Sequence, residues 1–347
     1  MNKTQRNPSS ARSLFFWNLV FWSFFGIWDL GIWDLCARGP LHAARADAVV
    51  AADGTGDYAT VQEAVDKAPQ TSSAGAPWTI LVKPGTYREV VYVQREKRGV
   101  RLVGEDAGNT VITAALNANL PSPDGKPIGT FRTATMQVDA DDFTLENLTV
   151  ENSFGPGSQA LAIRVDGDRA AFRRCRFLGW QDTILINRGR QYFEACLVAG
   201  AVDFIFGGAT AWFENCDIRV DGNGYITAAS TPADAAHGYV FNRCRVTASA
   251  DNIKTYLGRP WRQHAATLFM NCELGPCVRP EGWQQWKVAE PEKTVRYAEH
   301  ANTGPGADAS RRAAWSRQLA AAEAAAITPS AVLGDGWSPF RQAGPSR

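Results

Sequence analysis

Short strand-like segments that share one form recur through the middle of the chain. The form is Phe-x-x-Cys-x-apolar, in which apolar and polar positions alternate imperfectly. Its five cysteines are Cys175, Cys196, Cys216, Cys244 and Cys272, at intervals of 21, 20, 28 and 28 residues. Residues 143–148 repeat the form without the cysteine. Self-similarity at this period, with strand-type alternation, indicates a solenoid.

The solenoid that this pattern predicts is a parallel β-helix. No long helical pattern separates the repeats, which disfavours βαβ crossovers. Because the intervals are unequal, insertions are expected in the turns of one side, where a solenoid builds its cleft. A β-sandwich with a chance recurrence of Phe and Cys is the alternative.

Segments on either side of the repeats predict a cap, further strands and irregular ends. Thr60 and Glu63 have the spacing of a capping box, so a helix is expected to run to about Lys67 and to cover the open end of the stack. Gly54-x-Gly56 lacks the third glycine and the βαβ context of a nucleotide loop. The remaining expected elements are strands at 48–51, 78–82, 90–93 and 100–103, a loop at 116–129, an Ala-rich helix near 313–325 and a frayed tail at 341–347.

The first 46 of the 347 residues have the order of a secretory signal: basic residues, then an apolar run, then Ala44-Arg45-Ala46. Cleavage is expected after Ala46, which leaves residues 47–347 as one β domain that is secreted or periplasmic. A membrane anchor is the competing interpretation, although the run is short for a span. Removing the leader changes the formal net charge from +1 to −2, because five Lys/Arg and two Asp leave with it. A near-neutral chain gives no reason to expect nucleic acid as a partner, and a monomer is expected.

Six cysteines remain after the leader, and five of them occupy equivalent positions of the repeat. Stacking therefore predicts either a ladder of buried thiols or disulfides between coils. Neighbouring strands lie about 4.8 Å apart, within the Cα range that a disulfide accepts, and Cys196–Cys216 is the pair we favour. No Cys-x-x-Cys pair or histidine cluster points to a structural zinc site.

Two aspartates stand seven residues after a repeat cysteine: Asp182 after Cys175 and Asp203 after Cys196. On successive coils the two carboxyls would be neighbours. Asp203 lies in an apolar run and would need a cation such as Arg259 to stay ionised, whereas Asp182 could keep its proton. Two carboxyls in different protonation states form an acid/base pair. The alternative is that both aspartates cap turns and that Arg259 makes a structural ion pair.

Two glutamines complete a hydrolase with a carboxylate nucleophile. Gln181 is adjacent to Asp182, Gln159 lies in the preceding coil, and their amides could bind the oxyanion of a tetrahedral intermediate. No Gly-x-Ser-x-Gly elbow supports a serine hydrolase. Glycoside hydrolysis stays open, with a carboxyl separation of roughly 6.5–9.5 Å for inversion or about 5 Å for retention.

An ordered series of motifs resembles the signature of pectin methylesterases (pectinesterases) over residues 49–339. The series is Gly85-Thr86-Tyr87-Arg88-Glu89, Gln159-Ala160-Leu161-Ala162-Ile163-Arg164, Gln181-Asp182-Thr183, Gly200-Ala201-Val202-Asp203-Phe204-Ile205-Phe206-Gly207, Leu257-Gly258-Arg259-Pro260-Trp261, Gly282-Trp283-Gln284-Gln285-Trp286 and Asn302-Thr303-Gly304-Pro305-Gly306-Ala307. The resemblance implies a right-handed parallel β-helix that removes methyl esters from the galacturonate carboxyls of pectin, without a metal or cofactor.

The resemblance also implies roles for single residues. Asp203 matches the nucleophile, Asp182 the general acid and then base, and Arg259 the arginine that orients the nucleophile. The oxyanion donors and substrate contacts that it implies are Gln159, Gln181, Trp261, Phe206 and, less securely aligned, Thr135.

The chain departs from the family pattern at two positions. Leu185 stands where an aromatic residue is usual, so one sugar-stacking platform is expected to be lost. His300 replaces a usual tyrosine.

The alternative functions are another β-helix esterase, a glycosidase, a lyase or a non-catalytic polysaccharide-binding solenoid.

Overall fold

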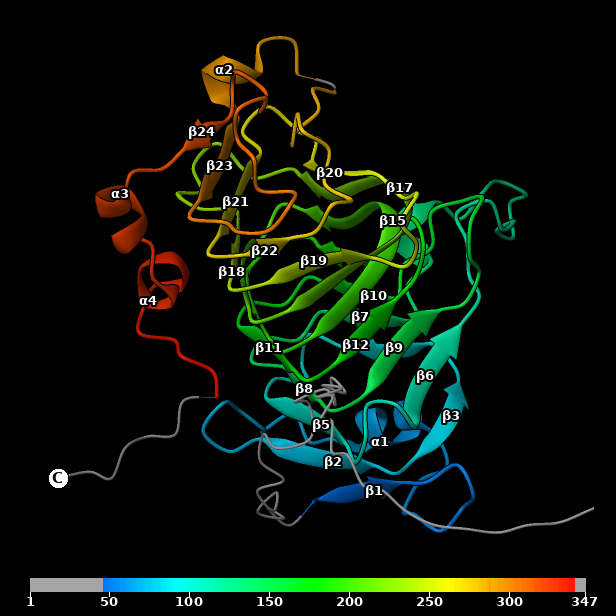
Figure 1. Cartoon of the computed structure of the whole chain (residues 1–347). Coiled ribbons are helices and arrows are strands. Elements are labelled where there is room, and N and C mark those ends of the chain that lie inside the picture. Colours follow the sequence, from blue (N-terminus) through cyan, green and yellow to red (C-terminus); the bar gives the residue numbers. More distant parts are fainter. Residues whose placement is uncertain (1–45, 287, 341–347) are drawn as a thin grey trace, which may run out of the picture. The chain divides into compact units, whose positions relative to one another are not determined.

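Strands of successive coils pair side by side and in parallel along the described chain, residues 46–286 and 288–340 of this computed structural model (Figure 1). One sheet has the order β1 (Ala48–Val50), β2 (Trp78–Val82), β5 (Val100–Gly104), β8 (Thr144–Glu146), β11 (Ala170–Arg173), β14 (Arg190–Glu194), β16 (Thr210–Glu214), β18 (Tyr239–Asn242), β21 (Ala266–Met270), β23 (Arg296–His300) and β24 (Arg317–Gln318).

The second sheet bends into two faces. Its path runs β3 (Gly85–Arg88), β6 (Thr110–Ala114), β9 (Thr149–Asn152), β12 (Arg176–Leu178), β15 (Leu197–Gly207), β13 (Ile184–Ile186), β10 (Ile163–Val165), β7 (Met136–Val138) and β4 (Val91–Val93), joined by β17 (Asp217–Ala229), β19 (Arg245–Ala248), β20 (Thr255–Gly258) and β22 (Glu273–Leu274). The long strands β15 and β17 serve both faces, since β15 pairs with β12 at its start and with β13 at its end. With the first sheet this makes a three-sided coil, and the predicted parallel β-helix is confirmed.

The repeat phenylalanines form a continuous stack in the core. Phe172, Phe193, Phe213, Phe241 and Phe269 are partners in the strand register and fully buried. Their ring centroids lie 4.6, 4.5, 4.4 and 4.3 Å apart, with interplanar angles of 16° or less. The separations follow the strand spacing, so the same pairing that joins the coils also stacks the rings.

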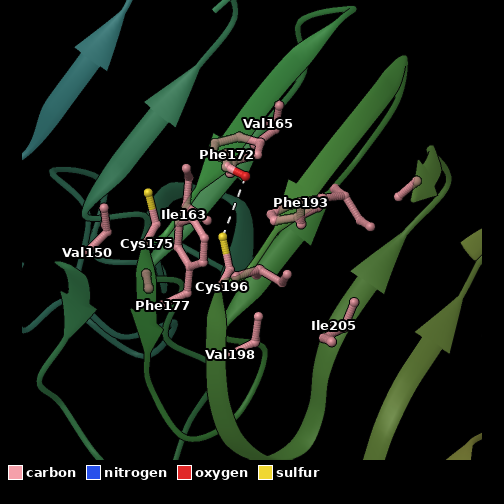
Figure 2. Close-up of a cluster of buried hydrophobic side chains, with 14 of the residues drawn as sticks. Val150, Ile163, Val165, Phe172, Cys175, Phe177, Phe193, Cys196, Val198 and Ile205 are labelled. Atoms are coloured by element: carbon pink, nitrogen blue, oxygen red, sulfur yellow. Dashed lines mark hydrogen bonds between the residues drawn. The ribbon is translucent and has the colours of Figure 1, made fainter. Parts of the chain in front are cut away.

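Each repeat cysteine follows a residue in the left-handed backbone region, which bends the chain between two faces. These residues are Arg174, Ala195, Asn215, Arg243 and Asn271, with φ between 51° and 56°. Each thiol then points to the carbonyl oxygen of the preceding coil, as Cys196 Sγ does to Phe172 O at 3.6 Å (Figure 2).

The Cys196–Cys216 disulfide that we favoured from the sequence is wrong, because both cysteines are free thiols. Cys196 and Cys216 instead bond to the carbonyls of Phe172 and Phe193. In-register stacking makes the two Cα–Cβ directions parallel, and each thiol bonds to a carbonyl of the coil before it.

The cysteine-free repeat is displaced by two residues from the frame expected from the sequence. Leu145, not Phe143, pairs with Phe172. Asn147 has the left-handed φ of 55°, and Leu148 takes the cysteine position. The position of the left-handed residue fixes how the repeats align. Phe143 resembles the first residue of the repeat only because it is also a phenylalanine.

The helix α1 (Val61–Lys67) covers the N-terminal end of the stack, as predicted. Val61 and the apolar residues of its inner face are fully buried. Thr60 caps the first turn by accepting from Glu63 N at 3.2 Å. Glu89 adds a second cap, because its two carboxylate oxygens accept from Val61 N and Gln62 N at 2.9 Å each. The acidic end of the Gly85–Glu89 motif therefore stabilises the helix N-terminus.

The C-terminal segment differs from the predicted helix over 313–325. Only Ala321–Ala325 is helical (α3), because β24 pairs with β23 before it. Strand pairing thus overrides the helix propensity of the alanines. The other helical segments are η1 (Thr130–Arg132), α2 (Pro291–Thr294) and α4 (Pro329–Leu333).

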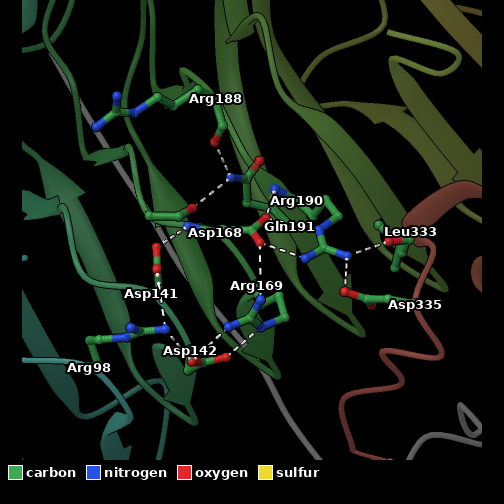
Figure 3. Close-up of polar contacts among 11 residues, drawn as sticks. Arg98, Asp141, Asp142, Asp168, Arg169, Arg188, Arg190, Gln191, Leu333 and Asp335 are labelled. Atoms are coloured by element: carbon green, nitrogen blue, oxygen red, sulfur yellow. Dashed lines mark hydrogen bonds and ion pairs between the residues drawn. The ribbon is translucent and has the colours of Figure 1, made fainter. Parts of the chain in front are cut away.

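An ion-pair network ties this segment to the outside of the first sheet (Figure 3). Arg190 binds Asp168 at 2.6 Å and Asp335 at 2.8 Å, and its guanidinium also donates to Leu333 O. The hydrogen bond to Asp168 raises the pKa of Arg190, so this arginine stays charged.

The other expectations can be placed directly. The strands expected at 48–51, 78–82, 90–93 and 100–103 are confirmed within a residue or two at each end, and residues 116–129 are a loop. The leader, except for Ala46, and the tail at 341–347 lie outside the described residues. In the described part of the chain, no helix is long and apolar enough to cross a membrane.

Replacing Phe213 by alanine should lower the free energy of unfolding by about 3–5 kcal/mol, since the ring is fully buried between two stacked neighbours. Equilibrium urea unfolding of the mature chain measures the change. Val90→Ala is the control, because Val90 is 47% exposed and should change stability by less than about 0.5 kcal/mol. Equal effects of the two substitutions would contradict the role of the stack.

Candidate active site

Asp182 and Asp203 occupy equivalent positions of neighbouring coils. Gln181 bridges Val202, Asp182 N donates to Val202 O at 3.0 Å, and Ile184 pairs with Ile205. Both aspartates have a left-handed backbone, with φ of 63° and 51°, a region that aspartate enters more readily than most residues. The shared seven-residue offset therefore places the two backbones about one strand spacing apart.

Arg259 holds Asp203 by two hydrogen bonds. Its Nε donates to Oδ1 at 2.9 Å and its Nη2 to Oδ2 at 2.6 Å. The pair is largely buried, with side-chain exposures of 16% for Arg259 and 8% for Asp203. A buried bidentate guanidinium stabilises the ionised carboxylate and fixes its orientation.

Asp182 is the protonated partner. Its pKa is raised from 3.8 to about 8, chiefly because the carboxyl is buried and also because Asp203 is negatively charged, while Arg259 opposes the shift. Among the described residues no group donates a hydrogen bond to its carboxyl. Two adjacent carboxyls thus differ in protonation at neutral pH, as the sequence suggested.

A cleft of about 260 Å³ opens over the two carboxyls. Its lining combines them with amide, cationic and aromatic side chains, namely Thr130, Phe131, Gln159, Gln181, Asp182, Asp203, Phe206, Ala228, Arg259, Trp261 and Trp286. A small polar centre with aromatic walls is typical of a carbohydrate or small-molecule site.

Gln159 and Gln181 enter the cleft from neighbouring coils. Ala160 N donates to Gln181 O at 3.1 Å, which brings the two segments together. Both side chains are partly exposed and line the cleft beside Asp182. Neither amide has a hydrogen-bond partner among the residues that the structure describes, so both N–H groups are available to an oxyanion.

Phe206 and Trp261 form one wall of the cleft. Phe206 is 5% exposed and meets Trp261 edge to face, with 5.8 Å between ring centroids. Leu185 pairs with Phe206 in the strand register and is fully buried. It belongs to the same apolar cluster as Phe206 and Trp261, so the leucine packs with this wall.

Thr135 does not reach the cleft. Its side chain is fully buried, and its hydroxyl donates to Glu151 O at 2.8 Å. The nearby cleft residues are instead Thr130 and Phe131, whose ring is 43% exposed. The Thr135 contact suggested by the family resemblance is thus not supported by the geometry, because the side chain is buried and its hydroxyl is bonded to the backbone.

Two aromatic residues at the site were missed from the sequence. Trp286 and Tyr225 place their rings 3.9 and 3.8 Å from the Arg259 guanidinium carbon. Trp286 ends a motif already noted, Gly282–Trp286, so that motif could have pointed to it. No local signal distinguishes Tyr225.

The described residues contain no group of three or more His, Cys, Asp or Glu side chains arranged to hold a metal ion. The cleft itself presents carboxyl, amide and guanidinium groups.

Comparisons with known proteins identify the family of this chain. The Pectinesterase family model matches residues 47–336. Pectinesterase 31 of Arabidopsis thaliana is 40% identical over 276 residues, which cover 78% of this chain and 86% of that protein. Pectinesterase/pectinesterase inhibitor U1 of Solanum lycopersicum is also 40% identical, over 84% of this chain but only 51% of its own length.

Solved structures give the same result. The pectin methylesterase from carrot superimposes with a TM-score of 0.77 at 34% identity, covering 84% of this chain and 93% of that one. The pectin methylesterase PemA from Erwinia chrysanthemi gives 0.75 at 31% identity, covering 86% and 99%. An aspartate-to-alanine mutant of a pectin methylesterase in complex with a hexasaccharide gives 0.76 at 30% identity, covering 86% and 100%. By sequence and by fold, this chain belongs to the pectinesterase family of carboxylic ester hydrolases.

Proposed function

We propose that this enzyme hydrolyses the methyl esters of galacturonate residues in pectin and releases methanol. The observation that carries the proposal is the pair of adjacent buried carboxyls, of which Arg259 binds only Asp203. An ester hydrolase needs a nucleophile for the carbonyl carbon and a proton donor for the leaving oxygen, and this pair supplies both. The pectinesterase relatives and the hexasaccharide complexes support pectin as the substrate.

In the first half of the reaction, an Asp203 carboxylate oxygen attacks the ester carbonyl carbon. The carbonyl oxygen becomes an oxyanion, which the amides of Gln159 and Gln181 bind. Asp182 gives its proton to the methoxy oxygen as the carbon–oxygen bond breaks, and methanol leaves. The product is an anhydride between Asp203 and the galacturonate.

In the second half, Asp182 is a carboxylate and acts as the base. It takes a proton from water while the water oxygen attacks the galacturonate carbonyl of the anhydride. The bond to Asp203 breaks, which frees the acid product and restores both aspartates to their starting states. Arg259 holds the Asp203 oxygens in place throughout.

The aromatic walls of the cleft fit a sugar chain. Phe131, Trp261 and Trp286 present ring surface around the carboxyls, and apolar ring faces pack on the C–H faces of sugars. A neutral methyl ester, unlike a free uronate, adds no charge beside Asp203 when it enters.

We further propose that the protein is exported and works as a monomer. Residues 1–46, which lie outside the described part except for Ala46, carry the order of a signal peptide with cleavage after Ala46. The cleft of this chain already holds both carboxyls, both glutamine amides and the arginine that the proposed reaction uses, so that reaction needs no residue from a second copy.

Asp203→Ala should reduce methanol release from methylated pectin by on the order of 10³ or more, because it removes the nucleophile. Asp234→Asn is the control, since Asp234 is exposed and outside the cleft, and should act like wild type. No methanol from the wild type would refute the function, and full activity of Asp203→Ala would refute the mechanism. Unsaturated uronate would indicate a lyase, and new reducing ends a glycosidase.

Asp182→Asn should stabilise the protein at neutral and alkaline pH. A carboxyl with a folded pKa of about 8, against an unfolded value near 4, binds its proton more tightly in the folded state between those values. The contribution of Asp182 to wild-type stability should therefore fall as the pH rises from about 4 to about 8, with a limiting slope of about 1.4 kcal/mol per pH unit. The neutral amide removes this dependence.

Thermal unfolding at several pH values measures this effect. The Asp182→Asn variant should melt above wild type at about pH 7.5, and the difference should shrink toward zero near pH 4. Asp234→Asn, at an exposed position, should track wild type at every pH. A constant offset between Asp182→Asn and wild type would show that Asp182 is already ionised in the folded protein.

A further inference from the structure

Three aromatic rings and two arginine side chains form a continuous stack that begins at the cleft and runs away from it. In order they are Trp286, Arg259, Tyr225, Tyr256 and Arg279. The guanidinium carbon of Arg259 lies 3.9 Å from the Trp286 ring centroid and 3.8 Å from that of Tyr225. Tyr225 stacks on Tyr256 at 5.5 Å and 12°, and Arg279 lies 5.2 Å from the Tyr256 ring.

The strand register builds the centre of this stack. Tyr225 in β17 pairs directly with Tyr256 in β20, so their rings lie over one another for the same reason as the core phenylalanines. The Tyr225 hydroxyl bonds to Gln284 Oε1, and Gln284 N donates to Gly258 O. Tyr225 is therefore held at its ring face and at its hydroxyl.

The two rings that flank Arg259 fix the plane of its guanidinium. A guanidinium has N–H groups only at its edge, so stacking on both faces leaves the edge to form hydrogen bonds. That edge presents Nε and Nη2 to the two oxygens of Asp203. The rings also keep water from both faces of the cation, which strengthens its attraction to the carboxylate.

We propose that Tyr225 is a positioning residue for catalysis: backed by Tyr256, it sets the guanidinium plane of Arg259 and thereby keeps the Asp203 nucleophile ionised and aligned. This inference rests on the ester-hydrolase function proposed above. Tyr225 is not among the residues that line the cleft, so it acts through Arg259 and not on the substrate.

The ionisation of Asp203 depends on the charged and titratable groups around it. The charged and titratable groups around Asp203 include Arg259, Asp182 on the neighbouring coil and Tyr297 in β23, whose hydroxyl is buried near it. Arg259 is the cation that binds both carboxylate oxygens. A tilted guanidinium would therefore favour the protonated, inactive form of Asp203, and activity would be lost first at acidic pH.

The test compares Tyr225→Leu, which removes the ring, with Tyr225→Phe, which keeps it. Methanol release should show a kcat for Tyr225→Leu about tenfold or more below wild type, with KM within about twofold. The acid limb of its kcat/KM profile should move to higher pH by about 0.5–1 unit. Tyr225→Phe should keep the wild-type limb. Tyr58→Leu, a partly buried tyrosine of the N-terminal cap, is the structural control and should leave the pH profile unchanged.

A second measurement separates this inference from the proposed function. Titration of the Asp203 carboxyl carbon by NMR, in protein labelled at aspartate, needs no turnover and should report protonation at higher pH in Tyr225→Leu than in wild type. Tyr256→Leu, which removes only the backing ring, should shift the titration in the same direction by less, and it serves if Tyr225→Leu does not fold. An unchanged Asp203 titration in the folded variants, or a rise in KM alone, would overturn the proposal.

Discussion

Parallel backbone pairing in a fixed register holds successive coils together and places equivalent residues directly over one another. The phenylalanine stack, the ladder of thiols and the left-handed bends all follow from this pairing. So do the two functional contacts, since Asp182 lies over Asp203 and Tyr225 over Tyr256. A slip of one residue would reverse the inward and outward side chains of a strand, so the core and the cleft depend on the same hydrogen bonds.

Stacking two carboxyls in this way is unfavourable unless they differ in charge. The fold separates them by their surroundings. Asp203 receives the guanidinium of Arg259, whereas Asp182 is buried with no hydrogen-bond donor among the described residues and keeps its proton. In a poorly hydrated cleft these differences have large effects on ionisation. The asymmetry that the reaction needs is therefore a consequence of folding.

The two longer intervals between the later cysteines contain residues that hold the nucleophile and line the cleft. The 28-residue interval after Cys216 contains Tyr225, and the one after Cys244 contains Tyr256, Arg259 and Trp261. Tyr225 and Tyr256 are paired strand residues, and the backbones of Arg259 and Trp261 bond to β17 just beyond β20. The cation and one aromatic wall residue are therefore held by the same strand pairing that joins the coils.

The sequence by itself determined the coils, their parallel pairing and the N-terminal cap. It also determined that Asp182 and Asp203 occupy equivalent positions on neighbouring coils, because all of these features follow from spacing and local alternation. The chemistry of an isolated aspartate also pointed to Arg259. Only the tertiary structure showed that Leu145 starts the cysteine-free repeat, that Cys196 and Cys216 stay unbridged, and that Thr135 turns away from the cleft.

The flanking of Arg259 by Trp286 and Tyr225, and the shortening of the C-terminal helix by a strand pair, were likewise set by the tertiary structure. Spacing along the chain fixes which coil a residue joins. The direction of its side chain, and the distant residue that it meets, depend on contacts that form only when the coils have stacked.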